Sequence, residues 1–259
     1  ISGSDGKKKL AKESSGATPA ELWAVYDGEY QEGDRIELSC DRENSFIFVK
    51  LDDAMEGAVL YYTGSYSFPI PFGEAKQSYS PTSFAGRRHY LFVREATEAE
   101  RTQERNLAYN PWDFHGNTGL FPHTWANVET RGESVFASRN AVDGLLANSF
   151  HGEWPYTSWG INRDPAAEFH LEFGREVELT TVGIYLRADF PHDAWWSGGT
   201  LSFSDGSSMQ LAFQKTDEEQ RFPFPPKKVS SLTFHTLIKA DDPSPFPALT
   251  QLKAYGREA

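Results

Sequence analysis

Short runs in which apolar and polar residues alternate recur along most of the chain. They are rich in β-branched and aromatic residues, as in Phe46-Ile-Phe-Val49 and His89-Tyr-Leu-Phe-Val-Arg94. Because successive side chains of a strand point to opposite faces, this alternation predicts strands with one buried face. Turn residues such as Asp27-Gly28 and Thr63-Gly64 separate the runs at roughly 8–12-residue spacing. The pattern as a whole predicts an all-β sandwich or barrel.

One stretch has the pattern of a helix instead. Residues Thr97–Arg105 are almost wholly polar, and Thr97 with Glu100 matches the spacing of a capping box. We expect a short surface helix there, followed by a domain boundary near residues 105–125. The sequence contains no Gly-rich phosphate loop, no alternation of strands and helices, and no internal repeat.

The strand and helix patterns divide the chain into consecutive segments. We expect a flexible leader at 1–21, a smaller β-rich N-terminal domain of unknown family at 22–104, an aromatic connector at 105–125 and a second β domain at 126–258. The leader is rich in Gly, Ser, Lys and Ala and lacks the apolar stretch of about 7–15 residues that a secretory signal needs. No apolar run approaches the roughly 20 residues that span a bilayer. We therefore expect a soluble chain, and its compartment stays open.

Composition narrows the classes of partner. The formal net charge is −12, which argues against nucleic-acid and anionic membrane surfaces, because both require clustered Lys and Arg. The single cysteine, Cys40, excludes an intramolecular disulfide and a Cys-rich zinc site. Aromatic residues make up 14% of the chain, and six of the seven tryptophans fall between Trp112 and Trp196. The clustered tryptophans are the feature that most needs an explanation.

The order of motifs in the second half resembles a known family. Asn140-Ala-Val-Asp-Gly144 is followed by the strand Phe169–Gly174, by a Ser-Asp-Gly hairpin at 204–206 and by the terminal run Leu249–Gly256. This order is similar to that of the discoidin, or coagulation-factor C-type, domain, which includes the family 32 carbohydrate-binding modules. The resemblance covers about residues 126–258. It implies a galactose-binding-like jelly-roll β-sandwich, whose loops at one end bind sugars, lipids or proteins.

The same resemblance implies a structural calcium ion. Its ligands would be Asp143, the residue five positions later and a residue near the last strand, which here are Asn148 and Gln251. Both amides keep an oxygen atom but lack a charge, and calcium affinity falls with the number of charged ligands. An alternative role for Asp143 is that of an ordinary Asp-Gly turn, in which its carboxylate accepts backbone hydrogen bonds.

Two predicted loops, 151–163 and 187–196, hold the candidate ligand site. Sugars present apolar C–H faces and a rim of hydroxyl groups, so their sites combine flat aromatic rings with planar hydrogen-bonding groups. The candidate rings are Trp154, Trp195 and Trp196, and the candidate hydrogen-bonding residues are His151, Arg187, Asp189 and His192. Core packing is the alternative, above all for Trp159 and for one ring of the Trp195-Trp196 pair. Arg187 and Asp189 would then form a structural ion pair.

These observations predict a non-catalytic carbohydrate-binding protein of roughly micromolar to millimolar affinity, without nucleic-acid binding or membrane insertion. The alternatives are a glycan-processing enzyme or its accessory subunit, with Glu153 and Asp193 as paired carboxylates, and a protein-interaction module that uses the same loops. The histidines show no recognised metal-ligand spacing such as His-Glu-x-x-His. The sequence leaves the sugar and the oligomeric state open.

Overall fold

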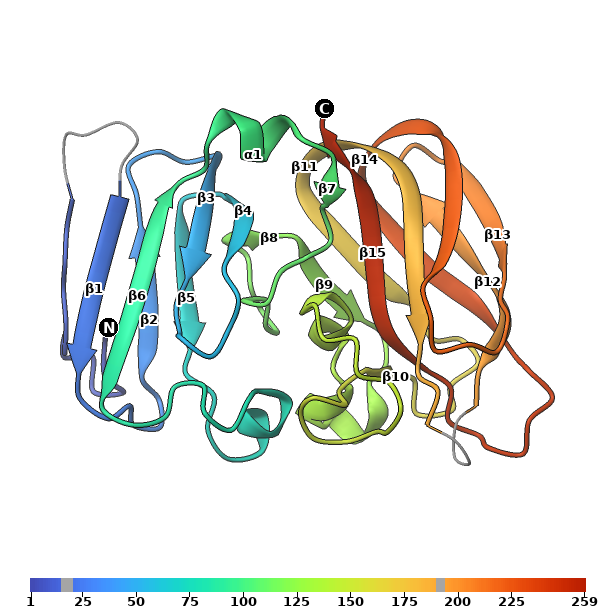
Figure 1. Cartoon of the computed structure of the whole chain (residues 1–259), viewed down its shortest axis with the longest axis horizontal. Helices are drawn as coiled ribbons and strands as arrows, with labels where there is room; N and C mark the ends of the chain where they lie inside the picture. Colours follow the sequence, from blue (N-terminus) through green and yellow to red (C-terminus); the bar gives the residue numbers. More distant parts are fainter. Residues whose placement is uncertain (15–20, 190–193) are drawn as a thin grey trace.

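The computed structural model describes residues 1–14, 21–189 and 194–259. The chain forms two β-rich halves that lie side by side, with green connecting segments between them (Figure 1). The described residues form strands, one short α-helix and a few 3-10 turns, so the expectation of an all-β fold is confirmed. No helix in the described ranges is long and apolar enough to cross a membrane.

The first half packs a five-stranded sheet against a two-stranded one. The larger sheet has the order β1-β6-β3-β4-β8, in which β8 (Leu120–Phe121) comes from the connector, and the smaller sheet pairs β2 with β5. Alternate residues face the space between them, where Ile36, Val49, Leu60 and Phe68 belong to one buried cluster. The strands are β1 (Glu21–Asp27), β2 (Arg35–Ser39), β3 (Ser45–Lys50), β4 (Ala58–Tyr62), β5 (Ser65–Pro69) and β6 (Arg88–Glu95).

The second half is built around two unusually long strands. The strand expected at Phe169–Gly174 continues without interruption as β11 (Phe169–Leu186), and β14 runs from Gln220 to Lys239. The remaining strands are β7 (Arg105–Asn106), β8 (Leu120–Phe121), β9 (His123–Ala126), β10 (Trp159–Gly160), β12 (Trp196–Phe203), β13 (Ser208–Ala212) and β15 (Ala248–Glu258).

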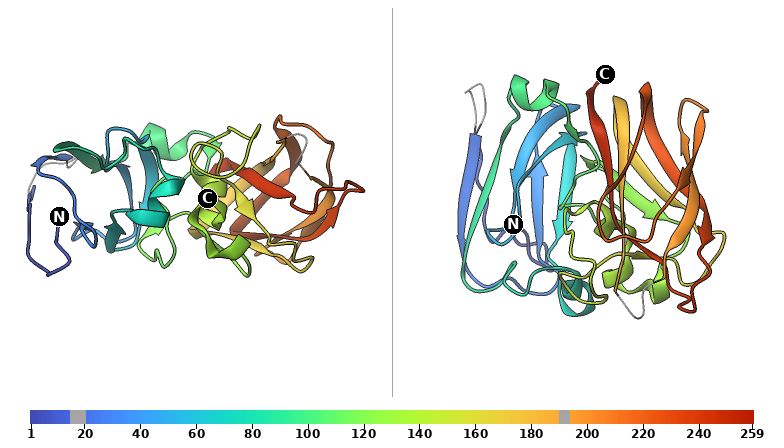
Figure 2. Two further views of the ribbon diagram at one scale, coloured as in Figure 1. Left: turned by 90° about the horizontal axis from the view of Figure 1, so that it is seen from below. Right: turned by 45° about the vertical axis from the view of Figure 1, so that its right-hand side comes forward.

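The length of β11 and β14 makes the second half a sandwich. The first part of β11 pairs with β9, its later part pairs with β15, and β14 follows it along both parts. Each long strand therefore passes from one layer to the other, and Figure 2 shows the two curved layers facing each other. Apolar residues from both layers fill the space between them, including Phe169, Leu179, Phe234 and Leu252.

Gly174 marks the place where β11 changes layer. Its φ of +70° lies in the left-handed region that L side chains rarely adopt, and a Cβ atom there would approach the ring of Phe121 to 2.5 Å. Phe121 belongs to β8, which pairs with β4 of the first half. Glycine at this position therefore allows the two halves to approach closely.

The connector forms short strands that pair with strands of both halves. β7 pairs with β15 and β9 pairs with β11, whereas β8 pairs with β4. The short helix α1 (Glu98–Thr102) precedes it, and the Thr97–Glu100 capping box is present as predicted, although the helix is shorter than expected. The chain thus crosses between the two halves more than once.

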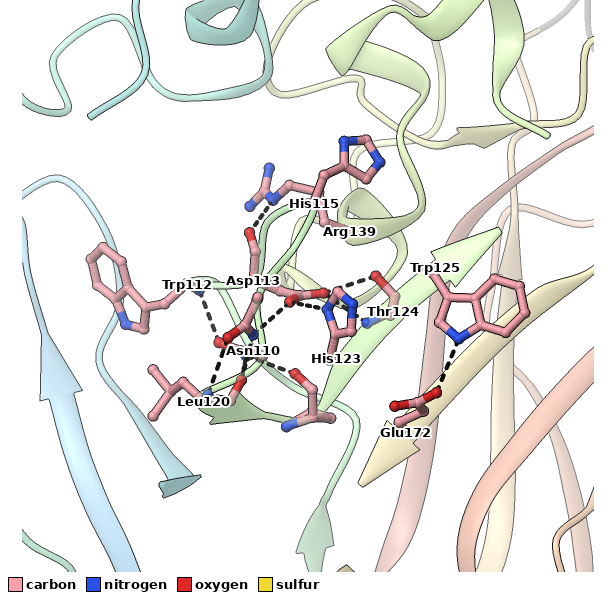
Figure 3. Close-up of polar contacts among 12 residues, drawn as sticks. Asn110, Trp112, Asp113, His115, Leu120, His123, Thr124, Trp125, Arg139 and Glu172 are labelled. Atoms are coloured by element: carbon pink, nitrogen blue, oxygen red, sulfur yellow. Dashed lines mark hydrogen bonds and ion pairs between the residues drawn. The ribbon is translucent and has the colours of Figure 1, made fainter. Parts of the chain in front are cut away.

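Buried polar side chains hold the connector in place (Figure 3). Asn110 donates to the carbonyl groups of Leu120 at 3.1 Å and Pro122 at 2.7 Å, and its own oxygen accepts from the backbone of Trp112. The Trp112 ring enters the core of the first half, where Nε1 donates to the carbonyl of Val49 at 3.1 Å. Buried backbone groups of an irregular segment are satisfied in this way.

Asp113 is the centre of this network. It is fully buried, and its carboxylate accepts from Nδ1 of His123 at 2.7 Å, from the backbone and hydroxyl of Thr124 at 2.8 and 2.9 Å, and from Nδ2 of Asn117 at 2.9 Å. Both carboxylate oxygens therefore bind donors from the connector and from β9.

Replacing Asp113 by Ala should lower the free energy of unfolding by about 3–5 kcal/mol, because the buried donors would lose their shared acceptor. Urea denaturation followed by circular dichroism measures the change. Asp41→Ala, at an exposed position, is the matched control and should change stability by less than about 0.5 kcal/mol. Equal effects of the two substitutions would contradict this role of Asp113.

The His123–Asp113 pair also predicts a pH dependence of stability. Burial alone would lower the pKa of His123, but the hydrogen bond and charge of Asp113 outweigh burial and raise it above 6.5. The stabilisation by this pair is therefore complete below the pKa that His123 has in the unfolded chain. It is lost as the pH rises through the pKa that His123 has in the folded protein. The stability difference between the wild type and His123→Gln, from urea titrations, should be larger at about pH 5.5 than at about pH 8. A difference independent of pH would contradict it.

Candidate functional site

Three predicted site residues meet in the loops at one end of the second half, at the bottom of Figure 1. Asp189 follows the end of β11 and forms an ion pair with Nε of Arg187 at 2.6 Å through Oδ1. Its other oxygen, Oδ2, hydrogen-bonds to Nδ1 of His151, which comes from a loop distant in sequence. Asp189 therefore links the two loops that the sequence selected.

Burial separates the roles of these three residues. The side chains of Arg187 and Asp189 are buried, whereas that of His151 is 37% exposed. Arg187 also donates to the backbone carbonyl of Phe246, in the loop between β14 and β15. The expectation that Arg187 and Asp189 form the rim of the site is therefore corrected: they lie beneath the surface as an ion pair that supports the three loops.

Exposed aromatic rings lie on the same loops. Phe150 is 57% exposed, and Trp154 and Phe246 are each 37% exposed. Phe150 stacks on His151 with ring centroids 5.3 Å apart and planes 15° apart, and the guanidinium of Arg163 lies 4.3 Å from the centre of the Phe246 ring. The sequence interpretation named Trp154 but missed Phe150 and Phe246. The signal for Phe150 was its position directly before His151.

The expectation that Trp196 forms a sugar platform is wrong. Trp196 begins β12 and is 1% exposed, since its ring packs 6.2 Å from that of Trp159 and edge-on against Phe234 at 5.8 Å. Trp159 is fully buried, in agreement with the alternative of core packing. Trp195 is half-buried and packs against the same core. His192 and Asp193 lie outside the described residues.

The candidate calcium ligands are only partly brought together. Asp143 accepts hydrogen bonds from the Leu145 backbone and from Nε2 of Gln251, both at 2.9 Å. Asn148 instead directs Nδ2 to the carbonyls of Leu186 and Asp217, each at 2.9 Å. Burial raises the pKa of Asp143 to about 6, although the charge of Arg139 opposes the shift.

These contacts do not fit a calcium site. Calcium takes six to eight oxygen ligands, whereas Asp143 faces an N–H donor of Gln251, and Asn148 points an N–H donor elsewhere. In the described part of the chain, no group of three or more His, Cys, Asp or Glu side chains is placed to hold a metal ion.

Two histidines, His115 and His123, lie in the connector. His115 contacts a carboxylate oxygen of Glu129 at 2.9 Å and is exposed. His123 bonds to Asp113, but the nearby hydroxyl of Thr124 also donates to Asp113. The described contacts of Asp113 therefore support the junction between the two halves.

Two cavities lie away from the loop end. One of about 550 Å³ is lined by α1 and the end of β15, and another of about 410 Å³ lies between the β2–β5 pair and residues 114–119. Neither cavity is lined by His151, Arg187 or Asp189.

Comparison with known proteins gives structural matches but none by sequence. No protein-family model and no curated protein matches the chain. A fucose-binding module of Streptococcus pneumoniae matches at 13% identity and a TM-score of 0.44, over 60% of this chain and 99% of the module. The lectin domain of lectinolysin in complex with Lewis B antigen matches at 15% identity and 0.42, over 60% and 98%. The family 32 module of C. perfringens NanJ in complex with galactose matches at 15% and 0.39, over 51% and 91%. The matches are to galactose-binding-like lectin domains.

The different burial of two tryptophans gives a direct test of the site description. Trp196→Ala should lower the free energy of unfolding by about 3–5 kcal/mol, because it opens a cavity in the core. Trp154→Ala, the matched control, should lower it by less than about 1 kcal/mol, because its ring is already partly exposed. Guanidinium denaturation followed by fluorescence measures both. A large loss of stability for Trp154→Ala, with a small loss for Trp196→Ala, would contradict the description of Trp196 as the core residue and Trp154 as the exposed one.

Proposed function

We propose that the chain binds a carbohydrate, without chemical conversion, at the loop end of the second sandwich. The observation that carries the proposal is a series of contacts that joins three loops. Phe150 stacks on His151, and His151 is joined through Asp189 and Arg187 to the backbone of Phe246. The rings of Phe150 and Phe246 are exposed, and that of His151 is partly exposed. Aromatic rings stack on the apolar C–H faces of a sugar, and an imidazole hydrogen-bonds its hydroxyl groups. These are the two kinds of contact that a pyranose needs.

Asp189 orients His151 for this role. Its carboxylate hydrogen-bonds Nδ1 of the imidazole, which favours the tautomer with the proton on Nδ1 and limits rotation of the ring. Phe150 stacks on the same ring and restricts it further. A side chain fixed before binding loses little conformational freedom when it meets the ligand, so its contacts contribute more to affinity.

The buried ion pair extends this order to the third loop. Arg187 pairs with Asp189 and donates to the Phe246 carbonyl, and the loop that carries Phe246 also contains Pro243, Pro245 and Pro247. Proline restricts the backbone and lowers the entropy that the loop loses on binding. The charge of Arg187 is balanced by Asp189, which favours a neutral sugar over a charged one. A site formed by a few exposed side chains should bind at roughly micromolar to millimolar Kd.

A glycan array followed by calorimetry tests the proposal. Galactose, fucose and Lewis B antigen are suitable first probes. His151→Ala, Phe150→Ala and Phe246→Ala should each weaken binding of the best array ligand by about tenfold or more. Trp125→Ala and Trp23→Ala remove exposed rings on other faces of the protein and are the matched controls, for which Kd should stay unchanged.

The opposite pattern would contradict the proposal. If the Trp125 or Trp23 variant lost sugar binding while the Phe150 and Phe246 variants kept it, the binding site would lie on a sheet face instead. Release of reducing ends from a polysaccharide, abolished by Glu153→Gln, would show that the chain is an enzyme instead.

A further inference from the structure

Gln251 occupies a central position among the residues that the family resemblance assigns to calcium. It lies on β15, is buried, and directs Nε2 between two oxygen atoms, the carbonyl of Asn140 at 2.5 Å and Oδ1 of Asp143 at 2.9 Å. Its own oxygen, Oε1, accepts from the backbone N–H of Gly144 at 3.0 Å. One amide group therefore closes the segment from Asn140 to Gly144 with three hydrogen bonds.

The hydrogen bonds fix which end of the amide faces the acidic side chain. In the opposite orientation, Oε1 would face the Asn140 carbonyl and the Asp143 carboxylate, and Nε2 would face the N–H of Gly144. All three contacts would then join two acceptors or two donors, and each buried group would lose its partner. The orientation in the structure is the one in which all three contacts are bonds.

We propose that Gln251 takes the place of the calcium ion that the resemblance implies, and that this segment is held without a metal. An N–H donor carries a partial positive charge and binds the same oxygen atoms that a cation would bind, but it offers the cation no lone pair. Its position 2.5 and 2.9 Å from the two oxygens leaves no space for an ion between them.

Arg139 supplies the positive charge on this side of the sandwich. Its guanidinium is buried, donates to Oδ1 of Asn140 at 3.1 Å and to the Asp113 carbonyl at 2.9 Å, and interacts electrostatically with Asp143. Asn148 contributes no donor to Asp143, because its Nδ2 bonds the carbonyls of Leu186 and Asp217. Among the described residues, Oδ2 of Asp143 is buried and has no hydrogen-bond partner, so it is the atom at which added calcium would bind if the proposal were wrong.

A single substitution should restore a metal site. Gln251→Glu replaces the N–H donor by a carboxylate oxygen, which brings two carboxylates and the Asn140 carbonyl together. Without a cation these groups repel, so the variant should melt at a lower temperature than the wild type in EDTA. Calcium at about 100 times its Kd should then raise the melting temperature of the variant by about 5–10 °C.

The response of the wild-type protein to calcium is the decisive measurement. The wild-type melting temperature should differ by less than about 1 °C between EDTA and millimolar CaCl₂, and calorimetry should show no saturable heat of calcium binding. Gln210→Glu, an exposed position on β13, adds the same charge elsewhere and should show no calcium response.

Calcium stabilisation of the wild type would overturn the proposal, whatever the variant does. A folded Gln251→Glu variant whose melting temperature does not rise with calcium would also overturn the proposal. The amide of Gln251 would then not be the group that takes the place of the ion. If the variant folds only after CaCl₂ is added, the proposal is supported. If it folds under neither condition, the wild-type titration alone decides. None of these outcomes depends on whether the protein binds a sugar.

Discussion

Buried backbone in the loops of this protein needs hydrogen-bond partners, and inward-facing polar side chains supply them. At the junction, Asn110 and Asp113 bind the connector so that its short strands reach both halves. In the second sandwich, Gln251 closes the segment from Asn140 to Gly144. The position of each loop depends on these buried contacts, because the sheets alone fix only the points at which the loops begin and end.

The same constraint shapes the candidate binding site. Its most polar residues, Arg187 and Asp189, are buried, and they act through His151 and through the backbone of Phe246. The exposed groups on the same loops include the rings of Phe150 and Phe246 and the imidazole of His151. Such a surface is suited to a ligand that offers both an apolar face and hydroxyl groups. The buried ion pair thus holds the loops in place, and the exposed rings are available to a ligand.

The sequence predicted the regular parts of the fold because alternation reports directly on a half-buried strand. The alternating runs Phe46–Val49 and His89–Arg94 lie within β3 and β6. The strand at Phe169–Gly174 was expected to end at Gly174, whereas in the structure this glycine lets β11 continue and change layer. At the candidate site, the structure joins the two expected loops through His151 and Asp189, but the direction of a side chain after a strand depends on tertiary packing, which the sequence does not give. For Trp196 and Arg187 the alternatives, core packing and a structural ion pair, therefore hold in place of the expected platform and rim. Phe246, which lies among three prolines, was missed.

A crystal structure of the protein with the tightest-binding sugar from a glycan array would test the central claim most directly. The account predicts sugar density against Phe150 and Phe246, with a hydroxyl group within hydrogen-bonding distance of the His151 ring and with Arg187 and Asp189 unmoved beneath it. Density instead on the exposed face around Trp125, or on the sheet face that carries Trp23 in the first half, with the loop end empty, would contradict it.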